Sequence, residues 1–143
     1  MFIIPVPFGT PEFDELLALR YKILREPLGL DFTAEQIAGE YSSTHLACYD
    51  SNWVLHGCLT LLPLENGEVK MRQVVVAGQS QRKGIGKMLV LESEEWARRK
   101  GFSKMVLHAR NTAVPFYGKL GYTPVGEPFF EVGISHFKMI KEL

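Results

Sequence analysis

The strongest chemical signal in the sequence is a polar, glycine-bearing loop at residues 81–87. It follows three consecutive valines and precedes an apolar pattern with helical spacing, so we expect a strand, a loop and a helix in that order. Amides in the first turn of a helix lack intrahelical partners and carry a positive partial charge. Gly84 and Gly86 would let an anionic ligand approach these amides closely, and Arg82 and Lys83 add positive charge. The segment therefore predicts a phosphate-binding loop.

Two widespread phosphate-binding motifs do not fit this loop. A P-loop requires glycine at position 81 and Ser or Thr at position 88, but the chain has Gln81 and Met88 there. A dinucleotide-binding loop requires a third glycine where the chain has Leu89. The remaining alternatives are a different kind of phosphate-binding loop and an ordinary helix that starts with glycines.

Residues 81–86 resemble the signature Q/R-x-x-G-x-G/A of the GNAT superfamily of N-acetyltransferases. Residues 111–122 are similar to that family's second hallmark, with Asn111 ahead of the pair Phe116 and Tyr117. The expected order of helices and strands also resembles that of GNAT proteins over nearly the whole chain. Two motifs at a suitable separation, within a suitable order of elements, make the resemblance specific.

The resemblance implies acetyl-CoA as co-substrate and suggests a role for each matching position. The pyrophosphate would be held by a loop that comprises Gln81, Arg82, Lys83, Gly84, Ile85, Gly86 and Lys87. The backbone of Val74 and Val76 would pair with the pantetheine arm. The Val76 N–H would donate to the thioester carbonyl and then to the developing oxyanion. Asn111 would also bind the cofactor, and Phe116 would pack on the pantetheine.

The same resemblance places Tyr117 near the sulfur atom, where it would give a proton to the leaving thiolate. An alkyl amine with a pKa of about 10 must lose a proton before it attacks, so a general base is useful. His108 is the candidate base because it ends an expected strand just ahead of Asn111. Glu131 and His136 belong to the last hairpin, which would reach the acceptor side. A water molecule could relay the proton in place of an assigned base.

The variable N-terminal region would cover the acceptor pocket in a GNAT protein. Arg20 lies on an apolar helical stripe, so it either extends its guanidinium to solvent, which we expect, or faces the pocket. In the pocket it would bind substrate together with Tyr41 and Arg72, and an acidic group on the acceptor would then be favoured. We expect Arg25 to extend to solvent.

Local patterns predict the elements that position these residues. Helices start after Thr10 and at the capping box of Thr33 and Gln36. The helix expected at 85–100 carries two i,i+4 ion pairs on its solvent face, Glu94 with Arg98 and Glu95 with Arg99. We expect further helices at 85–100 and 113–120, and strands at 2–6 (an edge strand, because of its prolines), 45–49, 53–62, 68–76, 104–108, 122–125 and 134–140.

This order of elements predicts an α/β protein. The resemblance narrows the prediction to the GNAT (acyl-CoA N-acyltransferase) fold, a mixed, mostly antiparallel sheet of six to seven strands flanked by about four helices. A length of 143 residues suits one N-acetyltransferase domain over residues 1–143.

Composition argues against several partners and compartments, although local basic patches remain possible. Lys and Arg total 16 and Asp and Glu total 16, which removes the bulk charge that would attract nucleic acid or an anionic membrane. Cys48 and Cys58 predict two free core thiols, and the apolar N-terminus lacks the basic residues of a signal peptide. No clustering of His, Cys, Asp and Glu suggests a metal site. We therefore expect a cytoplasmic, metal-free protein, either a monomer or a homodimer.

The sequence predicts transfer of an acetyl group from acetyl-CoA to a primary amine, with a small molecule as acceptor. Direct attack is expected because the chain carries no motif of covalent catalysis. Three alternatives remain open: a non-catalytic acyl-CoA-binding sensor, a protein acetyltransferase, and an enzyme that uses another donor such as succinyl-CoA. Arg72 could bind the additional carboxylate of such a donor.

Overall fold

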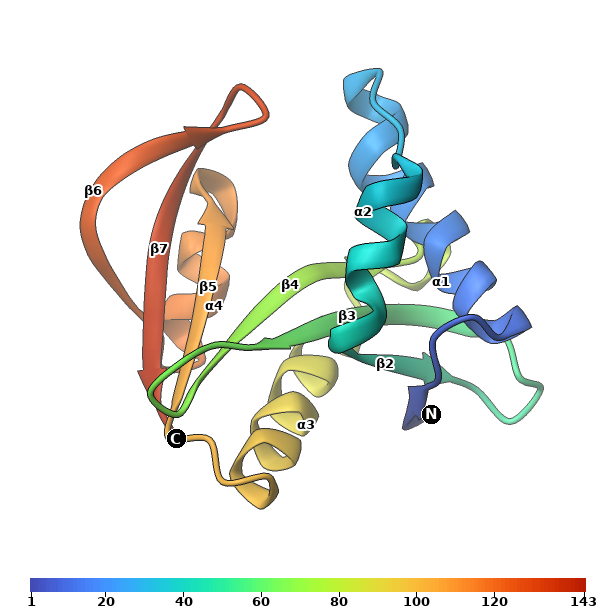
Figure 1. Cartoon of the computed structure of the whole chain (residues 1–143), viewed down its shortest axis with the longest axis horizontal. Helices are drawn as coiled ribbons and strands as arrows, with labels where there is room; N and C mark the ends of the chain where they lie inside the picture. Colours follow the sequence, from blue (N-terminus) through green and yellow to red (C-terminus); the bar gives the residue numbers. More distant parts are fainter.

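The computed structural model describes the whole chain, residues 1–143, and its elements follow the expected order (Figure 1). None of its helices is long and apolar enough to cross a membrane. The helices are α1 (Pro11–Arg20), α2 (Ala34–Gly39), α3 (Ile85–Arg99) and α4 (Val114–Lys119), with the π-helical turn η1 (Tyr21–Arg25) and the 3₁₀ turns η2 (Glu26–Leu28), η3 (Glu40–Ser42), η4 (Gly78–Ser80) and η5 (Asn111–Ala113). The strands are β1 (Phe2–Val6), β2 (Thr44–Tyr49), β3 (Leu55–Pro63), β4 (Glu68–Val76), β5 (Lys104–Arg110), β6 (Thr123–Glu131) and β7 (Ile134–Glu142).

All strands belong to one seven-stranded sheet with the order β1-β2-β3-β4-β5-β7-β6. Neighbouring strands run antiparallel, except that β4 and β5 are parallel. The prediction of a mixed, mostly antiparallel sheet of six to seven strands with four α-helices is confirmed. The proline-bearing strand β1 also lies at an edge as predicted, where a missing N–H disrupts no ladder.

The parallel pair of β4 and β5 is joined only at its beginning. Residues 68–71 pair with residues 104–107, and beyond these positions the two strands diverge, as Figure 1 shows. Backbone N–H and C=O groups on the facing edges of such an opening have no strand partner there. The sheet therefore presents main-chain hydrogen-bonding groups to any ligand that enters the opening.

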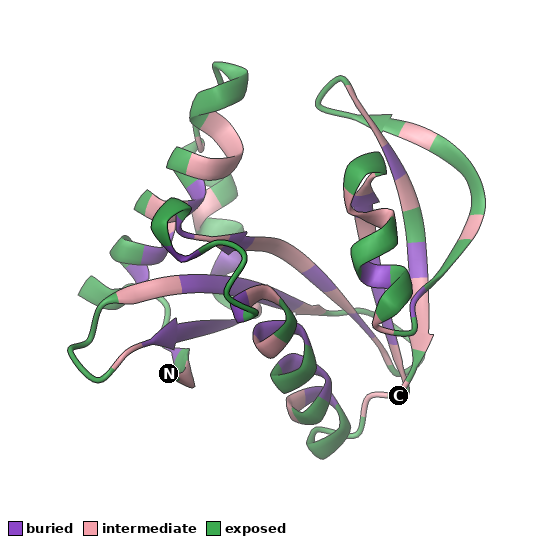
Figure 2. Cartoon of the chain, turned by 180° about the vertical axis from the view of Figure 1, so that it is seen from behind, coloured by how far each residue is buried: buried purple, intermediate pink, exposed green.

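The sheet separates two apolar cores. On one face α3 and α4 bury Leu89 and Tyr117 against the central strands, and on the other face α1 buries Phe13 and Leu16. Figure 2 shows the buried residues concentrated along the central strands and the inner side of α3, whereas β6 is largely exposed. The free thiols of the two cysteines are buried, one in each core, which confirms that prediction.

Side-chain caps fix the starts of α1 and α2. The Thr10 hydroxyl accepts a hydrogen bond from the Phe13 N–H at 3.2 Å. The Thr33 hydroxyl accepts from the Gln36 N–H at 3.1 Å, and the Gln36 Oε1 accepts in return from the Thr33 N–H at 2.9 Å. Caps of this kind each contribute about 1 kcal/mol to stability. Both helix starts predicted from the sequence are confirmed.

Several expected strand boundaries are wrong: β5 continues to Arg110 and β7 to Glu142, each two residues beyond the expected end. β6 continues to Glu131 instead of ending at position 125, because a bulge between Val125 and Phe129 absorbs the intervening glycine and proline at the sheet edge. β3 begins at Leu55 rather than at position 53, because Trp53 has a φ of 60° and belongs to the preceding turn.

Glu94 also departs from the expectation that it lies on the solvent face of α3. Its carboxylate is buried and accepts hydrogen bonds from the Tyr122 hydroxyl at 2.9 Å and from the Lys141 Nζ at 2.8 Å. The expected ion pair with Arg98 is present at 3.8 Å, whereas Glu95 pairs with Arg98 and not with Arg99 as expected. Helical periodicity identifies the neighbour on α3 but not the partners from distant segments, which make burial of this charge tolerable.

Candidate active site

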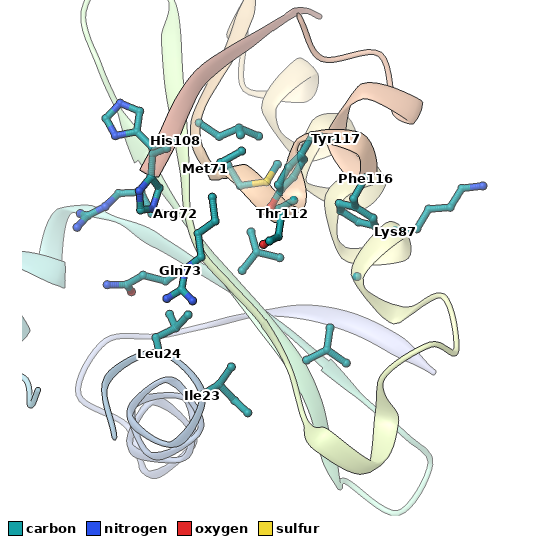
Figure 3. Close-up of a pocket in the computed structure, with 18 of the residues that line it drawn as sticks. Ile23, Leu24, Met71, Arg72, Gln73, Lys87, His108, Thr112, Phe116 and Tyr117 are labelled. Atoms are coloured by element: carbon teal, nitrogen blue, oxygen red, sulfur yellow. The ribbon is translucent and has the colours of Figure 1, made fainter. Parts of the chain in front are cut away.

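A cleft of about 1040 Å³ occupies the opening between β4 and β5. Its walls come from η1, β4, the start of α3, β5, α4 and the turn between β6 and β7. Figure 3 shows Ile23 and Leu24 of η1 on one side of the cleft and Thr112 and Tyr117 on the other. A concave site of this size suits a small-molecule ligand or cofactor.

The loop ahead of α3 has the backbone geometry of an anion-binding site. Arg82 and Gly84 adopt left-handed conformations with φ of 65° and 79°. Left-handed geometry is strained for a non-glycine residue, and such strain concentrates at functional sites. No side chain caps the N-terminus of α3, so the first-turn amides of Ile85, Gly86 and Lys87 stay free of helical partners, and these three residues line the cleft.

Val76 directs its backbone N–H away from β3 and toward the opening. The Ala77 N–H donates to the His56 carbonyl at 2.9 Å, which makes residues 77 and 56 a hydrogen-bonded pair of the antiparallel ladder. The adjacent pair, Val76 and Gly57, is then non-hydrogen-bonded, and its backbone groups point outward. The Val76 carbonyl accepts from the Gln81 Nε2 at 3.2 Å, which links the strand to the loop.

Phe116 and Tyr117 bring two aromatic rings from α4 to the cleft. Their centroids lie 5.0 Å apart in an edge-to-face arrangement, and Tyr117 packs against Tyr122 in the same way at 5.7 Å. Phe116 is partly exposed, whereas Tyr117 is 8% exposed. Burial raises the pKa of Tyr117 to about 12, so its phenol stays protonated at neutral pH and can donate a hydrogen bond.

Three titratable side chains form a cluster on the far side of the cleft. The His108 Nδ1–H donates to the Glu131 Oε1 at 3.1 Å, and the His136 Nε2 lies 3.8 Å from the Glu131 Oε2. The His136 Nδ1–H donates to the Ile134 carbonyl at 2.7 Å. In both rings these bonds assign the proton to Nδ1, which leaves Nε2 able to accept one.

Burial by itself would raise the pKa of Glu131. The hydrogen bond from His108 and the positive charges of His108, His136 and Lys70 outweigh that effect, and the net pKa lies below its ordinary value. Glu131 is therefore an anion at neutral pH. An imidazolium formed on either histidine would gain a carboxylate partner.

The structure gathers most of the sequence-predicted site residues at this cleft. The residues that line it are Arg72, Val74, Val76, Gln81, Arg82, Gly84, Ile85, Gly86, Lys87, His108, Phe116, Tyr117, Glu131 and His136. Lys83 and Asn111 flank the cleft without lining it. Tyr41 is 77% exposed and packs edge-to-face on Phe8 at 6.0 Å, away from the cleft.

Both expectations for the N-terminal arginines are wrong. Arg20 does not extend to solvent and does not line the cleft, because its side chain is completely buried beside Glu40, His45 and Thr60. Arg25 lines the cleft instead, and its guanidinium lies 4.8 Å from the centroid of the Phe32 ring. The π-helical turn shifts the register of the stripe after α1, and simple helical spacing does not foresee such a shift.

Several lining residues were not singled out from the sequence, namely Ile23, Leu24, Lys70, Met71, Gln73, Leu107, Ala109, Arg110, Thr112, Ala113 and Val132. Strand alternation could have identified Lys70, which lies two residues from Arg72 on the same strand face. Gln73 has a φ of 54° at a bulge in β4, and no sequence signal marks a bulge at a glutamine.

Comparison with known proteins fits this geometry. A family model described as "Acetyltransferase (GNAT) domain" matches residues 25–143. The chain belongs to the GNAT acetyltransferase family. The resemblance drawn from the two motifs is thereby confirmed over most of the chain.

Two Bacillus subtilis proteins are among the relatives of this GNAT chain. The chain is 35% identical over 74 residues to the uncharacterised protein YyaT, a match that covers 52% of the chain and 50% of YyaT. It is 30% identical over 104 residues to the uncharacterised N-acetyltransferase YjcF, which covers 72% of the chain and 73% of YjcF. The chain thus spans about half the length of one relative and nearly three quarters of the other.

A solved acetyltransferase structure has the same fold. The aminoglycoside 6′-N-acetyltransferase complexed with coenzyme A superposes with a TM-score of 0.83 at 18% identity, covering 99% of this chain and 97% of that one. At this identity the likeness shows the shared fold.

Proposed function

We propose that this GNAT protein transfers an acetyl group from acetyl-CoA to a primary amine of a small molecule by direct attack. One observation carries the proposal: a single cleft has the uncapped start of α3 at one end and the pair of His108 and Glu131 at the other. The first suits a phosphate-bearing donor and the second suits deprotonation of an amine. The buried free thiols suit a reducing compartment, and we infer the cytoplasm.

The residues at the loop end fit coenzyme A. Free amides of the first turn of α3 would bind the pyrophosphate, with positive charge from Arg82 and Lys87. A Cβ on Gly86 would meet Phe116 at 3.6 Å and Val76 at 3.7 Å, so a larger residue there would narrow the channel beside β4. Val74 and Val76 would pair with the amide-bearing arm of the donor, Phe116 would pack on it, and Lys83 and Asn111 would contribute from the rim.

The residues at the other end fit a base for the amine. The His108 Nε2 would take the proton of the attacking nitrogen, and Glu131 would orient the ring and stabilise the imidazolium that results. As the new C–N bond forms, negative charge develops on the thioester oxygen. The outward-facing N–H of Val76 would donate a hydrogen bond to that oxygen.

Tyr117 would act on the leaving group as the C–S bond breaks. With a pKa of about 12, its phenol is a weaker acid than a thiol, whose pKa lies near 8.5, so complete proton transfer to the thiolate is uphill. The benefit of Tyr117 is therefore a hydrogen bond to the sulfur while negative charge accumulates on it. The thiolate then takes its proton from solvent.

The test is the release of free thiol from acetyl-CoA in the presence of primary amines. We expect release that depends on both protein and amine, with the acetylated amine detected by mass spectrometry. Binding of acetyl-CoA without release for any amine or peptide would overturn the proposal in favour of a sensor. Release with lysine-containing peptides alone would contradict the small-molecule acceptor and favour a protein acetyltransferase.

A further inference from the structure

The charge of the cleft differs from that of the whole chain. The chain balances 16 basic against 16 acidic residues. The cleft, in contrast, is lined by one carboxylate, Glu131, and by six basic side chains, namely Arg25, Lys70, Arg72, Arg82, Lys87 and Arg110. Walls of low dielectric focus such an imbalance into a strong local field that attracts anions.

Two of these cations stand side by side on β4. Lys70 and Arg72 alternate with the buried Val69 and Met71, so both point to the opposite sheet face and lie about 6.6 Å apart along the strand. The strand register aligns Lys70 with Val106 of β5, whose face also carries His108 and Arg110. The positive charges thus adjoin the proposed base.

Lys70 and Arg72 have no anionic partner within the protein. The ion pairs of the structure join other residues, and none involves either of these two. Burial lowers the pKa of Lys70, and the neighbouring charges of Arg72 and Lys138 lower it further, while Glu131 opposes the change. Two adjacent cations that are partly desolvated and unpaired would be stabilised by an anion bound between them.

The phosphates of the donor do not account for this pair. Arg72 and Val76 are four residue steps apart along β4, a distance of about 13 Å, and the phosphate loop begins beyond Val76. Figure 3 shows Arg72, Gln73 and His108 gathered at one end of the cleft, while Lys87 and Phe116 lie at the other. Lys70 and Arg72 therefore belong to the end where the acceptor would bind.

Groups that can receive an ammonium lie at the same end. The Gln73 Oε1 is buried without a hydrogen-bond partner, and Gln73 lines the cleft. Glu131 is the one carboxylate on the wall. Within one site, Lys70 and Arg72 therefore suit an anionic group, and Gln73 and Glu131 suit an amine.

We propose that the acceptor is an amine that also carries an anionic group, a carboxylate or a phosphate, and that Lys70 and Arg72 bind this group. The inference rests on the proposed function, because it names the acceptor class for the same cleft. Gln73 and Glu131 hold the amine beside His108.

The first test compares amines that differ only by an acid group. Tryptamine and tryptophan, or phenethylamine and phenylalanine, are matched for a carboxylate, and ethanolamine and phosphoethanolamine are matched for a phosphate. We expect kcat/KM to be about 10- to 100-fold higher for at least one acid-bearing partner, because a charge-assisted, bidentate contact to arginine has that strength. Comparison of the carboxylate pairs with the phosphate pair shows which of the two anionic groups the site binds.

The second test removes the positive charge at position 72. Arg72→Gln should raise the KM for the acid-bearing amine by about 10- to 100-fold and leave the KM for its neutral partner unchanged. Arg99→Gln, an exposed position on α3, is the matched control and should change neither KM. Calorimetric binding of acetyl-CoA should be the same in all three proteins, which shows that the variants are folded.

Each contrary outcome has a distinct meaning. Equal use of matched amines by the wild type would overturn the acceptor class while acetyl transfer stands. If the wild type prefers succinyl-CoA to acetyl-CoA and Arg72→Gln abolishes this preference, then Arg72 binds the donor. This result would overturn the proposed acceptor class. Absence of turnover with every amine, despite acetyl-CoA binding, would instead contradict the proposed function.

Discussion

A single hydrogen bond at His108 decides which of its ring nitrogens can act on a substrate. Because the Nδ1–H is engaged by Glu131 at 3.1 Å, the lone pair is on Nε2. The same carboxylate lies 3.8 Å from the His136 Nε2, so the charge of one glutamate serves both rings. The proposed chemistry at His108 of β5 thus depends on its hydrogen bond to Glu131 of β6.

Replacing His108 tests the base. His108→Gln should lower kcat by about 100-fold, within the range that general base catalysis supplies, and leave acetyl-CoA binding unchanged. Steady-state kinetics measure kcat and calorimetry measures acetyl-CoA binding. An undiminished kcat would show that the proton leaves through water, and a loss in His136→Gln alone would assign the base to the other ring.

Replacing Tyr117 tests the leaving-group contact. Tyr117→Phe keeps the rings packed against Phe116 and Tyr122 but removes the hydroxyl. A hydrogen bond to a charged partner contributes about 1.5–3 kcal/mol, so kcat should fall by about 10- to 100-fold with little change in acetyl-CoA affinity. Steady-state kinetics and calorimetry measure the two quantities, and full activity would remove Tyr117 from the mechanism.

At the scale of elements, a buried polar network fastens the N-terminal helices to the sheet. Arg20, the last residue of α1, donates through Nη2 to the His45 Nδ1 at 2.8 Å and to the Thr60 hydroxyl. Its Nη1 lies 3.5 Å from the Glu40 Oε1 of η3. The cleft-lining turn η1 follows Arg20 directly, so this network sets the position of that wall.

Breaking one partner of this network should be costly. Arg20→Met leaves the Glu40 carboxylate buried without its cation, and we expect a loss of about 3–5 kcal/mol in the free energy of unfolding. The double variant with Glu40→Gln should lose less than the sum of the two single variants, because they act on one interaction. Urea unfolding measures all three, and additive losses would contradict coupling between the two side chains.

His45 makes part of this stability depend on pH. Burial lowers its pKa from 6.5, and Arg20 lowers it further, while the bond to the Glu40 carbonyl acts in the opposite direction. Below about pH 6.5 the unfolded chain therefore binds more protons than the folded one, and the free energy of unfolding falls as pH decreases. His45→Gln should lose less stability than the wild type between pH 7.5 and 5.5; equal losses would contradict this origin.

Local patterns in the sequence predict well where helices and strands lie. They predict less well which way charged side chains point. The caps at Thr10 and Thr33 and the bounds of β4 are confirmed because they depend on neighbouring residues. Arg20, expected in solvent, is buried because its partners come from η3, β2 and β3, and Arg25 lines the cleft because it lies on the π-helical turn. Glu94 is buried because its partners come from segments that only the folded chain brings close.

For the molecule as a whole, the residues at the loop end of the cleft were predictable from the sequence, and those at the other end only in part. The loop at 81–87 and the pair Phe116 and Tyr117 are local motifs, and they meet at the cleft as the family resemblance implied. The acceptor wall combines η1, β4, β5 and the β6–β7 turn, which are distant in sequence. The net charge of zero did not indicate a positive cleft, because a net charge does not show where the charged residues lie in the fold.

The most direct test of the account is the melting temperature with and without acetyl-CoA. A ligand at a hundred times its Kd adds about 2.7 kcal/mol to the folded state, which raises the Tm of a domain of this size by about 5–10 °C. Gly84→Ala, which forces a Cβ into left-handed backbone at φ 79°, should reduce this rise, whereas Gly39→Ala on α2 should not. No rise in the wild type with acetyl-CoA or coenzyme A would contradict a donor site at the start of α3.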